Sequence, residues 1–255
     1  MSNGRCAIGV MAKAPQAGRS KTRLCPPLLP EQAAALSAAF LRDITENIAL
    51  ASQSAPIDGL IAYAPAGSET LFDGHLAKGT DLLLAIGTDD MPADVTGFGR
   101  CLLHAIQGML AQGYTAACVL NSDSPTLPTE ILAQAANLLL QQRECVVLGP
   151  AEDGGYYLLG MRQVHARLFA DIAWSSETVA DATRARTAEL DLELVELPIW
   201  YDVDDRAALL RLMDETRAPV AAAGLVPHAA PATAAAIDRM GLRALALPPL
   251  HQAAE

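Results

Sequence analysis

Cations gather in one short stretch near the start of the chain, residues 11–24, which read MAKAPQAGRSKTRL. This stretch holds two of the three lysines of the chain, and its four cations are Lys13, Arg19, Lys21 and Arg23. No Asp or Glu occurs before residue 31, although the whole chain has a net charge of −11. A cationic segment without acids in an acidic protein favours an anionic ligand such as phosphate. The alternative is a solvated basic turn.

The neighbourhood of this stretch supports the phosphate interpretation. An apolar run over residues 6–11 precedes it and predicts a first strand, and α/β proteins bind phosphate in the loop after such a strand. Gly18 permits unusual backbone angles and close approach of a ligand. A Walker A loop needs G-x-x-x-x-G-K-[ST], but Pro15 and Ser20 stand at its glycine positions before Lys21. The pattern therefore excludes a P-loop NTPase.

A candidate metal ligand follows a second apolar run. Residues 116–120 are continuously apolar, which is typical of a strand buried on both faces. Asp123 comes just after this run, where a carboxylate suits a Mg²⁺ ion, or Mn²⁺, that bridges protein and phosphate oxygens. The alternative is an Asx-turn or a helix cap before Pro125.

Two further acidic segments are expected at the same edge of the sheet, because ligands bind at the carboxyl ends of parallel strands. Asp202 and Asp204 are two residues apart, so in an extended segment both side chains point the same way, towards the same metal ion. Asp204 equally fits a cap for the following helix. Asp153 stands beside Gly154 and Gly155, where the backbone can approach a phosphate closely, or where the chain makes a tight turn.

Alternating apolar patterns predict an α/β protein of three layers, with a mostly parallel, Rossmann-like sheet between helices. The expected strands cover 6–11, 57–64, 82–86, 116–120, 145–148, 156–161 and 192–197. The expected helices cover 30–51, 68–77, 98–111, 129–142, 175–188, 206–215 and 233–242, with Ser175 and Asp204 as candidate caps. We expect one nucleotide-binding transferase domain over residues 1–215 and an Ala/Pro-rich extension over 216–255 that could join two copies of the chain.

Composition limits the possible partners. Hydrophobic residues make up 51% of the chain and charged residues 18%, which indicates a globular protein. The acidic balance argues against nucleic-acid binding, since that needs an extended cationic surface. Neither a signal peptide nor a membrane-spanning run is evident, so we expect a cytoplasmic protein without a membrane partner.

Five runs in a fixed order resemble a known family: KAPQAGRSKTRL, NSDSPTLP, GPAEDGGYYLLG, WSSET and WYDVDD. Over residues 6–213 the chain is similar to the DUF2064 group of GT-A-fold, nucleotide-diphospho-sugar transferase-like glycosyltransferases. It is more distantly similar to 2-phospho-lactate guanylyltransferases and molybdenum-cofactor nucleotidyltransferases. The chain departs from the family at Asn121, where Gly is usual, and at residues 205–206, where Thr-Pro is frequent. Over residues 87–99 an expected Gly-Asp-Leu-Gly-like turn is missing, and only Gly97, Gly99 and Arg100 remain of it.

The resemblance implies a Mg²⁺-dependent transferase that moves a glycosyl or nucleotidyl group from a nucleotide donor to a small acceptor. By this resemblance Asp123 corresponds to the metal-binding acid, Lys21 and Arg23 face the phosphates, and Asp202 or Asp204 matches a late acidic pair. Catalysis would come from positioning and charge neutralisation, with Lys21 and Asp123 as its centre. The alternative is a nucleotide-binding or regulatory module that keeps the fold without turnover.

Overall fold

A seven-stranded sheet forms the centre of the computed structural model, which describes residues 4–141, 143–221 and 224–244. The strand order is β3-β2-β1-β4-β6-β5-β7. Strand β6 runs antiparallel to β4 and β5, and every other pairing is parallel, so the predicted mostly parallel sheet is confirmed. The strands are β1 (Cys6–Ala12), β2 (Ile57–Tyr63), β3 (Asp81–Leu84), β4 (Ala116–Leu120), β5 (Cys145–Pro150), β6 (Tyr156–Met161) and β7 (Glu193–Glu196).

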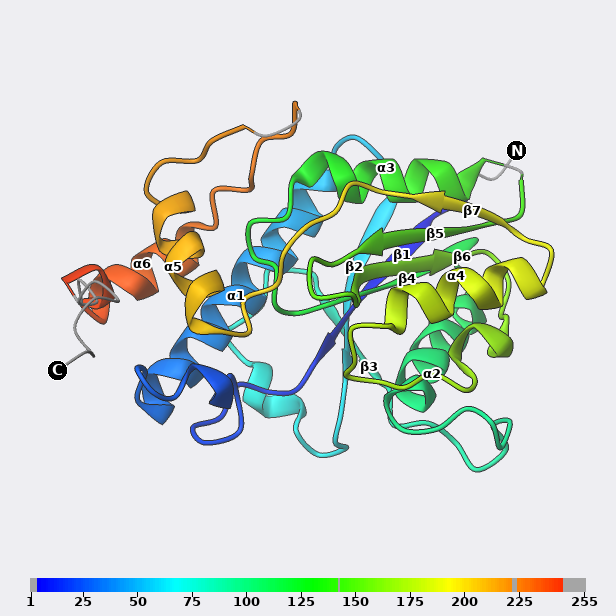
Figure 1. The fold of residues 1–255 in the computed structure, drawn as a ribbon, viewed down its shortest axis with the longest axis horizontal. Coiled ribbons are helices and arrows are strands. Elements are labelled where there is room, and N and C mark those ends of the chain that lie inside the picture. The colour runs from blue at the N-terminus through cyan, green and yellow to red at the C-terminus, as the bar shows by residue number, and fades with distance from the viewer. Residues whose placement is uncertain (1–3, 142, 222–223, 245–255) are drawn as a thin grey trace, which may run out of the picture.

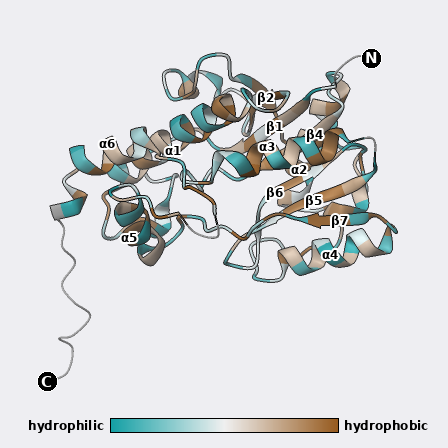
Figure 2. Ribbon diagram, turned by 90° about the horizontal axis from the view of Figure 1, so that it is seen from above, coloured by the Kyte–Doolittle hydropathy of each residue, from teal (hydrophilic) through white to brown (hydrophobic). Residues whose placement is uncertain are grey.

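Helices cover both faces of this sheet, as the three-layer prediction requires (Figure 1). The α-helices are α1 (Pro30–Ala51), α2 (Phe98–Ala111), α3 (Thr129–Leu140), α4 (Val179–Glu189), α5 (Arg206–Glu215) and α6 (Pro231–Arg239). Helices α1 and α3 pack on one face, while α2 and α4 pack on the other. Figure 2 shows mainly hydrophobic strands between helices that also carry hydrophilic residues.

The central strands are apolar throughout because both of their faces are covered. In β1, Ile8 and Val10 belong to the core under α1 and α3, while Ala7 belongs to the core under α2. All five residues of β4 are buried in the same two-sided way. Polar side chains in a strand buried on both faces would lose their contacts with water at a cost in free energy. The polar residues therefore follow the end of the strand. This is why the candidate site residues follow the strands.

Two local predictions are wrong. The helix expected over 68–77 is only a 3₁₀ turn, Glu69–Phe72, because the chain then turns at Gly74 with a φ of 77°. Ser175 does not cap the next helix: α4 begins four residues later, at Val179, and Ser175 has a left-handed backbone with a φ of 65°.

The described part of the extension packs against the rest of the chain, and residues 222–223 and 245–255 of that prediction lie outside the described residues. Helix α6 lies along α1 (Figure 1), where the buried carboxylate of Asp43 accepts hydrogen bonds from the backbone N–H groups of Ala232 (2.9 Å) and Thr233 (2.7 Å). The helix predicted over 233–242 therefore exists, with the bounds Pro231–Arg239. The domain division after residue 215 and the joining of two copies stay predictions. No helix among the described residues combines the length and the apolarity that crossing a membrane requires.

Candidate functional site

Lys21 is the buried centre of the site. It follows β1 and precedes a 3₁₀ turn, Thr22–Leu24, with a left-handed backbone (φ 48°), a conformation that costs a non-glycine residue about 1 kcal/mol. Its side chain points inwards and is only 6% exposed. The ammonium lies 5.4 Å from the centre of the Phe40 ring of α1. An amine this deeply buried needs anionic or carbonyl partners.

Those partners come from two segments that are distant in sequence. The Nζ atom of Lys21 lies 2.7 Å from Oδ1 of Asp123 and 3.0 Å from Oδ1 of Asp204, and it donates to the carbonyl oxygen of Val203 at 2.7 Å. Burial by itself would lower the pKa of Lys21, but the two carboxylates outweigh it. The pKa of Lys21 is therefore raised, and the ammonium stays charged at neutral pH.

Backbone contacts hold the two acidic segments together. The N–H of Val203 donates to the carbonyl oxygen of Asp123 at 2.9 Å, and the hydroxyl of Ser124 donates to the carbonyl oxygen of Tyr201 at 2.8 Å. Tyr201 and Val203 are buried, while Asp202 and Asp204 are partly exposed. This alternation is what their spacing predicts for an extended segment, while a metal ion shared by the two acids stays a prediction.

The structure corrects the predicted helix cap. The carboxylate of Asp205 accepts a hydrogen bond from the N–H of Ala208 at 2.8 Å and caps α5. Asp204 instead contacts Lys21 and, at 3.4 Å, the guanidinium of Arg23. The capping residue is thus one position later than the sequence suggested, which leaves Asp204 available to the site.

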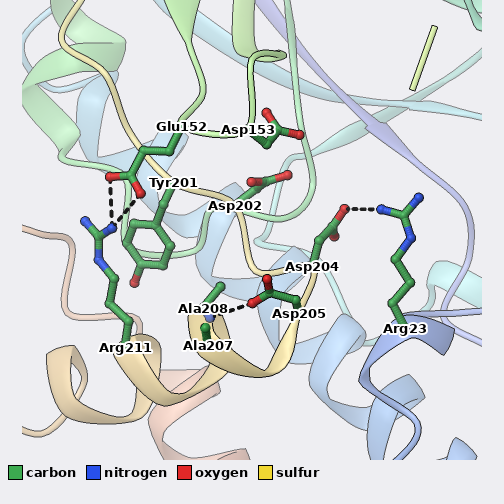
Figure 3. Close-up of a pocket in the computed structure, with 10 residues that line it drawn as sticks. All are labelled: Arg23, Glu152, Asp153, Tyr201, Asp202, Asp204, Asp205, Ala207, Ala208 and Arg211. Carbon is green, nitrogen blue, oxygen red and sulfur yellow. Dashed lines mark hydrogen bonds and ion pairs between the residues drawn. The ribbon is translucent and has the colours of Figure 1, made fainter. Parts of the chain in front are cut away.

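Asp202 lies among other acids in a hollow of about 510 Å³, here called the acidic hollow (Figure 3). Burial, together with the charges of Asp153 and Asp204, raises the pKa of Asp202 to about 6. On the far side of the hollow the guanidinium of Arg211 lies 3.7 Å from the centre of the Tyr201 ring and pairs with Glu152 at 2.9 Å.

The turn between β5 and β6, predicted either to approach a phosphate or to form a tight turn, is a tight turn in the structure. The carboxylate of Asp153 accepts a hydrogen bond from the N–H of Gly155 at 2.8 Å, as in a tight turn. Gly154 has a φ of 87°, and a Cβ atom there would lie 2.0 Å from the carbonyl oxygen of Glu177. The missing side chain of Gly154 therefore allows the backbone at Glu177 to pack against this turn. None of the three turn residues lines the hollow that contains Lys21.

The four predicted cations line a single hollow of about 430 Å³, here called the basic hollow. Lys13, Arg19, Lys21 and Arg23 share it with Asp123 and Asp204. Gly18 lies in the same loop with a φ of 74°, and a Cβ atom there would meet nothing within 4 Å. The structure thus assembles the cationic wall and two of the predicted metal-binding acids around one space.

The acids around Lys21 determine whether the site fits a metal ion. Among the residues that the structure describes, no group of three or more Asp, Glu, His or Cys side chains has the geometry of a metal site. The carboxylates of Asp123 and Asp204 nevertheless converge on one cation, the Lys21 ammonium. Mg²⁺ is often held by one or two carboxylates with substrate phosphates and water, so these two acids fit an ion that arrives with a phosphate ligand.

Aromatic residues at the site were missed by sequence reasoning. Phe98, the first residue of α2, is 50% exposed, and its ring meets Trp174 edge to face with centroids 6.0 Å apart. Tyr156 begins β6 beside them. Trp174 lies within the WSSET run, but nothing in the sequence alone indicates what an isolated tryptophan packs against.

Comparisons with known proteins give the same fold. Residues 47–176 match the family described as "Uncharacterized protein conserved in bacteria (DUF2064)". No protein of curated function matches the sequence. A crystal structure from Desulfovibrio desulfuricans G20, provisionally named a nucleotide-diphospho-sugar transferase, is 26% identical, with a TM-score of 0.75 over 95% of this chain and 96% of that one.

A second solved structure is more distant and shows the fold alone. It is a cytidylyltransferase from Leptospira borgpetersenii serovar Hardjo-bovis, with 11% identity and a TM-score of 0.51 over 94% of this chain and 96% of that one. Together with the strand order and the three layers, these likenesses confirm the expected GT-A-type fold.

Proposed function

Because the chain belongs to the DUF2064 family and has a nucleotide-diphospho-sugar transferase fold, we propose that it is a Mg²⁺-dependent transferase. It moves a glycosyl or nucleotidyl group from a nucleotide donor to a small acceptor. The observation that carries the proposal is the buried Lys21 ammonium, which joins a cationic loop to Asp123 and Asp204 in one hollow.

The donor phosphates bind in the basic hollow. Lys13 and Arg19 are exposed side chains that reach the phosphate oxygens from the loop, and Lys21 meets them from the floor of the hollow. Fixed cations of this kind neutralise the charge that develops on the leaving phosphate, and they need little reorganisation during the reaction. Positioning of donor and acceptor supplies the remainder of the rate enhancement.

Asp123 and Asp204 would hold the metal ion together with the donor phosphates, and Asp202 is the further candidate ligand. When bound, Mg²⁺ or Mn²⁺ supplies Lewis-acid polarisation of the phosphate oxygens. Lys21 contacts Oδ1 of each carboxylate, so Oδ2 of Asp123 remains for the metal ion, while Oδ2 of Asp204 is paired with Arg23 at 3.4 Å. The donor phosphates offer Arg23 a replacement partner, so metal and donor should bind together.

The test is calorimetric titration of the protein with the common nucleoside triphosphates and sugar nucleotides, with and without Mg²⁺. We expect at least one of these donors to bind, more tightly with Mg²⁺ than without it. The matched variants Lys21→Met and Lys78→Met show whether the basic hollow is responsible, since Lys78 is an exposed lysine outside it. Absence of binding by every donor would reject the proposal.

The group transferred is identified by its products. Release of pyrophosphate from a nucleoside triphosphate indicates nucleotidyl transfer, whereas release of a nucleoside diphosphate from a sugar nucleotide indicates glycosyl transfer. The alternative function is a nucleotide-binding module without turnover, in which Lys21 stays between the two carboxylates. The ion pairs of Asp204 with Lys21 and Arg23 favour that alternative, because they occupy both oxygens of this carboxylate. Donor binding without either product, across the acceptors described below, would support it.

A further inference from the structure

A second hollow adjoins the basic one and has a different lining. Its volume is about 470 Å³, within the range of small-molecule sites, and we call it the aromatic hollow. The two hollows share Arg23, Phe98, Asp123 and Asp204. A donor in the basic hollow and a second molecule in the aromatic hollow would therefore meet at Asp123.

Aromatic side chains form one wall of the aromatic hollow. Phe98 and Trp174 meet edge to face, and Tyr156 lies beside them on β6. Trp174 packs directly on the start of α2. A Cβ atom at Gly99 would lie 2.8 Å from the Trp174 ring, so only glycine leaves room for this contact. The glycine that remains from the altered family turn thus leaves room for an aromatic platform.

Two polar groups of this wall have no partner among the described residues. The phenol oxygen of Tyr156 and the indole Nε1 of Trp174 are buried without a hydrogen bond. Both atoms have almost no accessible surface, and Nε1 faces Gly99, where a Cβ atom would lie 2.9 Å from it, so this wall presents aromatic carbon to the hollow. Ser175, whose left-handed backbone places it at the edge of the hollow, adds an exposed hydroxyl.

The charges of the aromatic hollow oppose a second anion. Asp153 and Glu177 line it, and Glu177 makes no ion pair among the described residues. Arg23, the one cation among the described residues that line it, is already paired with Asp204. The basic hollow, in contrast, is lined by four cations. A phosphate group placed beside Asp153 and Glu177 would meet like charges.

From this contrast we infer that the acceptor is an uncharged, hydroxyl-rich ring, such as a sugar or a cyclic polyol, and not a phosphorylated molecule. Its ring lies against Trp174 and Phe98, and its hydroxyls bond to the carboxylate of Asp153 and the hydroxyl of Ser175, while Glu177 repels a charged acceptor. The inference rests on the proposed function, because it identifies the acceptor class for the same site.

A single-tryptophan variant tests this directly. The chain has two tryptophans, Trp174 and the buried Trp200, so Trp200→Phe leaves Trp174 as the only fluorescent indole. The variant is saturated with Mg²⁺ and a donor already shown to bind by calorimetry. It is then titrated with two matched pairs of probes: glucose with glucose 6-phosphate, and myo-inositol with myo-inositol 1-phosphate.

We expect at least one neutral probe to change the Trp174 emission, with an affinity on the order of tenfold or more above that of its phosphorylated counterpart. Equal or tighter binding of the phosphorylated probe overturns the inference. So does the lack of any neutral response up to about 10 mM, which is ten times the upper end of usual KM values. Because donor binding is measured first, these outcomes are distinct from failure of the proposed function.

A charge-reversal pair identifies the residue responsible. Glu177→Arg in the Trp200→Phe background should raise the affinity for the phosphorylated probe by about tenfold and leave the neutral probe within about threefold. The control is Asp73→Arg, which reverses an exposed carboxylate that lines neither hollow. An equal effect of both reversals would assign the preference to net charge and reject the role of Glu177.

Discussion

Two buried charges of this protein are held in different ways. Lys21 is paired with the carboxylates of Asp123 and Asp204, which are 32% and 38% exposed and therefore free to exchange partners. Asp43 is fully buried in α1 and is held by two backbone N–H groups at the start of α6. The first charge lies at the edge of a hollow, while the second joins two helices.

The difference separates a charge that can serve a ligand from one that serves the fold. Backbone N–H groups at a helix start cannot turn towards another partner without unwinding the helix. Side chains can do so by a change of rotamer. Substitution at Lys21 should therefore act on ligand binding, and substitution at Asp43 should act on stability.

The largest effect is expected at Lys21. Lys21→Met should lower the affinity for the donor nucleotide by about 10- to 100-fold, because it removes a charge-assisted contact worth about 1.5–3 kcal/mol. Calorimetric titration measures the affinity, and Lys78→Met, which changes a lysine outside the hollow, should leave it unchanged. Equal affinities of wild type and Lys21→Met would remove Lys21 from the binding site.

Asp43→Asn should lower the stability of the fold and leave donor binding nearly unchanged. The amide can accept only one of the two N–H bonds and turns its NH₂ group towards the other donor, so the free energy of unfolding should fall by about 2 kcal/mol. Urea denaturation measures this loss. Donor affinity should stay within twofold of the wild-type value, and a large loss of affinity would show that the α1–α6 contact is coupled to the site.

Asp123→Asn tests the metal contribution. The amide keeps the size of the side chain but loses the charge, so Mg²⁺ should no longer increase donor affinity, a loss of about tenfold. Titrations with and without Mg²⁺ should then coincide, and the circular dichroism spectrum should remain that of the wild type. An unchanged Mg²⁺ effect in this variant would mean that the metal ion binds elsewhere.

The smallest effect concerns Asp202 and depends on pH. The folded pKa of about 6 lies above the ordinary value of 3.8, so the unfolded chain ionises first, and stability is lost as pH rises from about 4 to about 6. This difference corresponds to about 3 kcal/mol, which solvent screening of a partly exposed carboxylate reduces to about 1 kcal/mol. Asp202→Asn should therefore be more stable than wild type above pH 6 and equal to it below pH 4. Parallel pH profiles of the two proteins would contradict the raised pKa.

The sequence determined most of the fold. Apolar runs located every strand of the sheet, and helical spacing gave the bounds of α1, α2 and α5 as the structure has them. These signals are local, since the period of the apolar residues follows from the geometry of each element. The failures were at turns such as residues 68–77 and at Ser175, where glycines and packing by distant residues overrule local propensity.

For the site, the sequence by itself determined which side chains follow the strands: the acid-free cationic loop, Asp123, and the pair Asp202 and Asp204. Only the tertiary structure decided that Lys21 lies between Asp123 and Asp204, that Asp205 and not Asp204 caps α5, and that Gly154 packs on the chain. Spacing along the chain fixes which side of a strand a residue lies on. The partner of a buried charge depends instead on segments 100 to 200 residues apart, which meet only when the sheet is assembled.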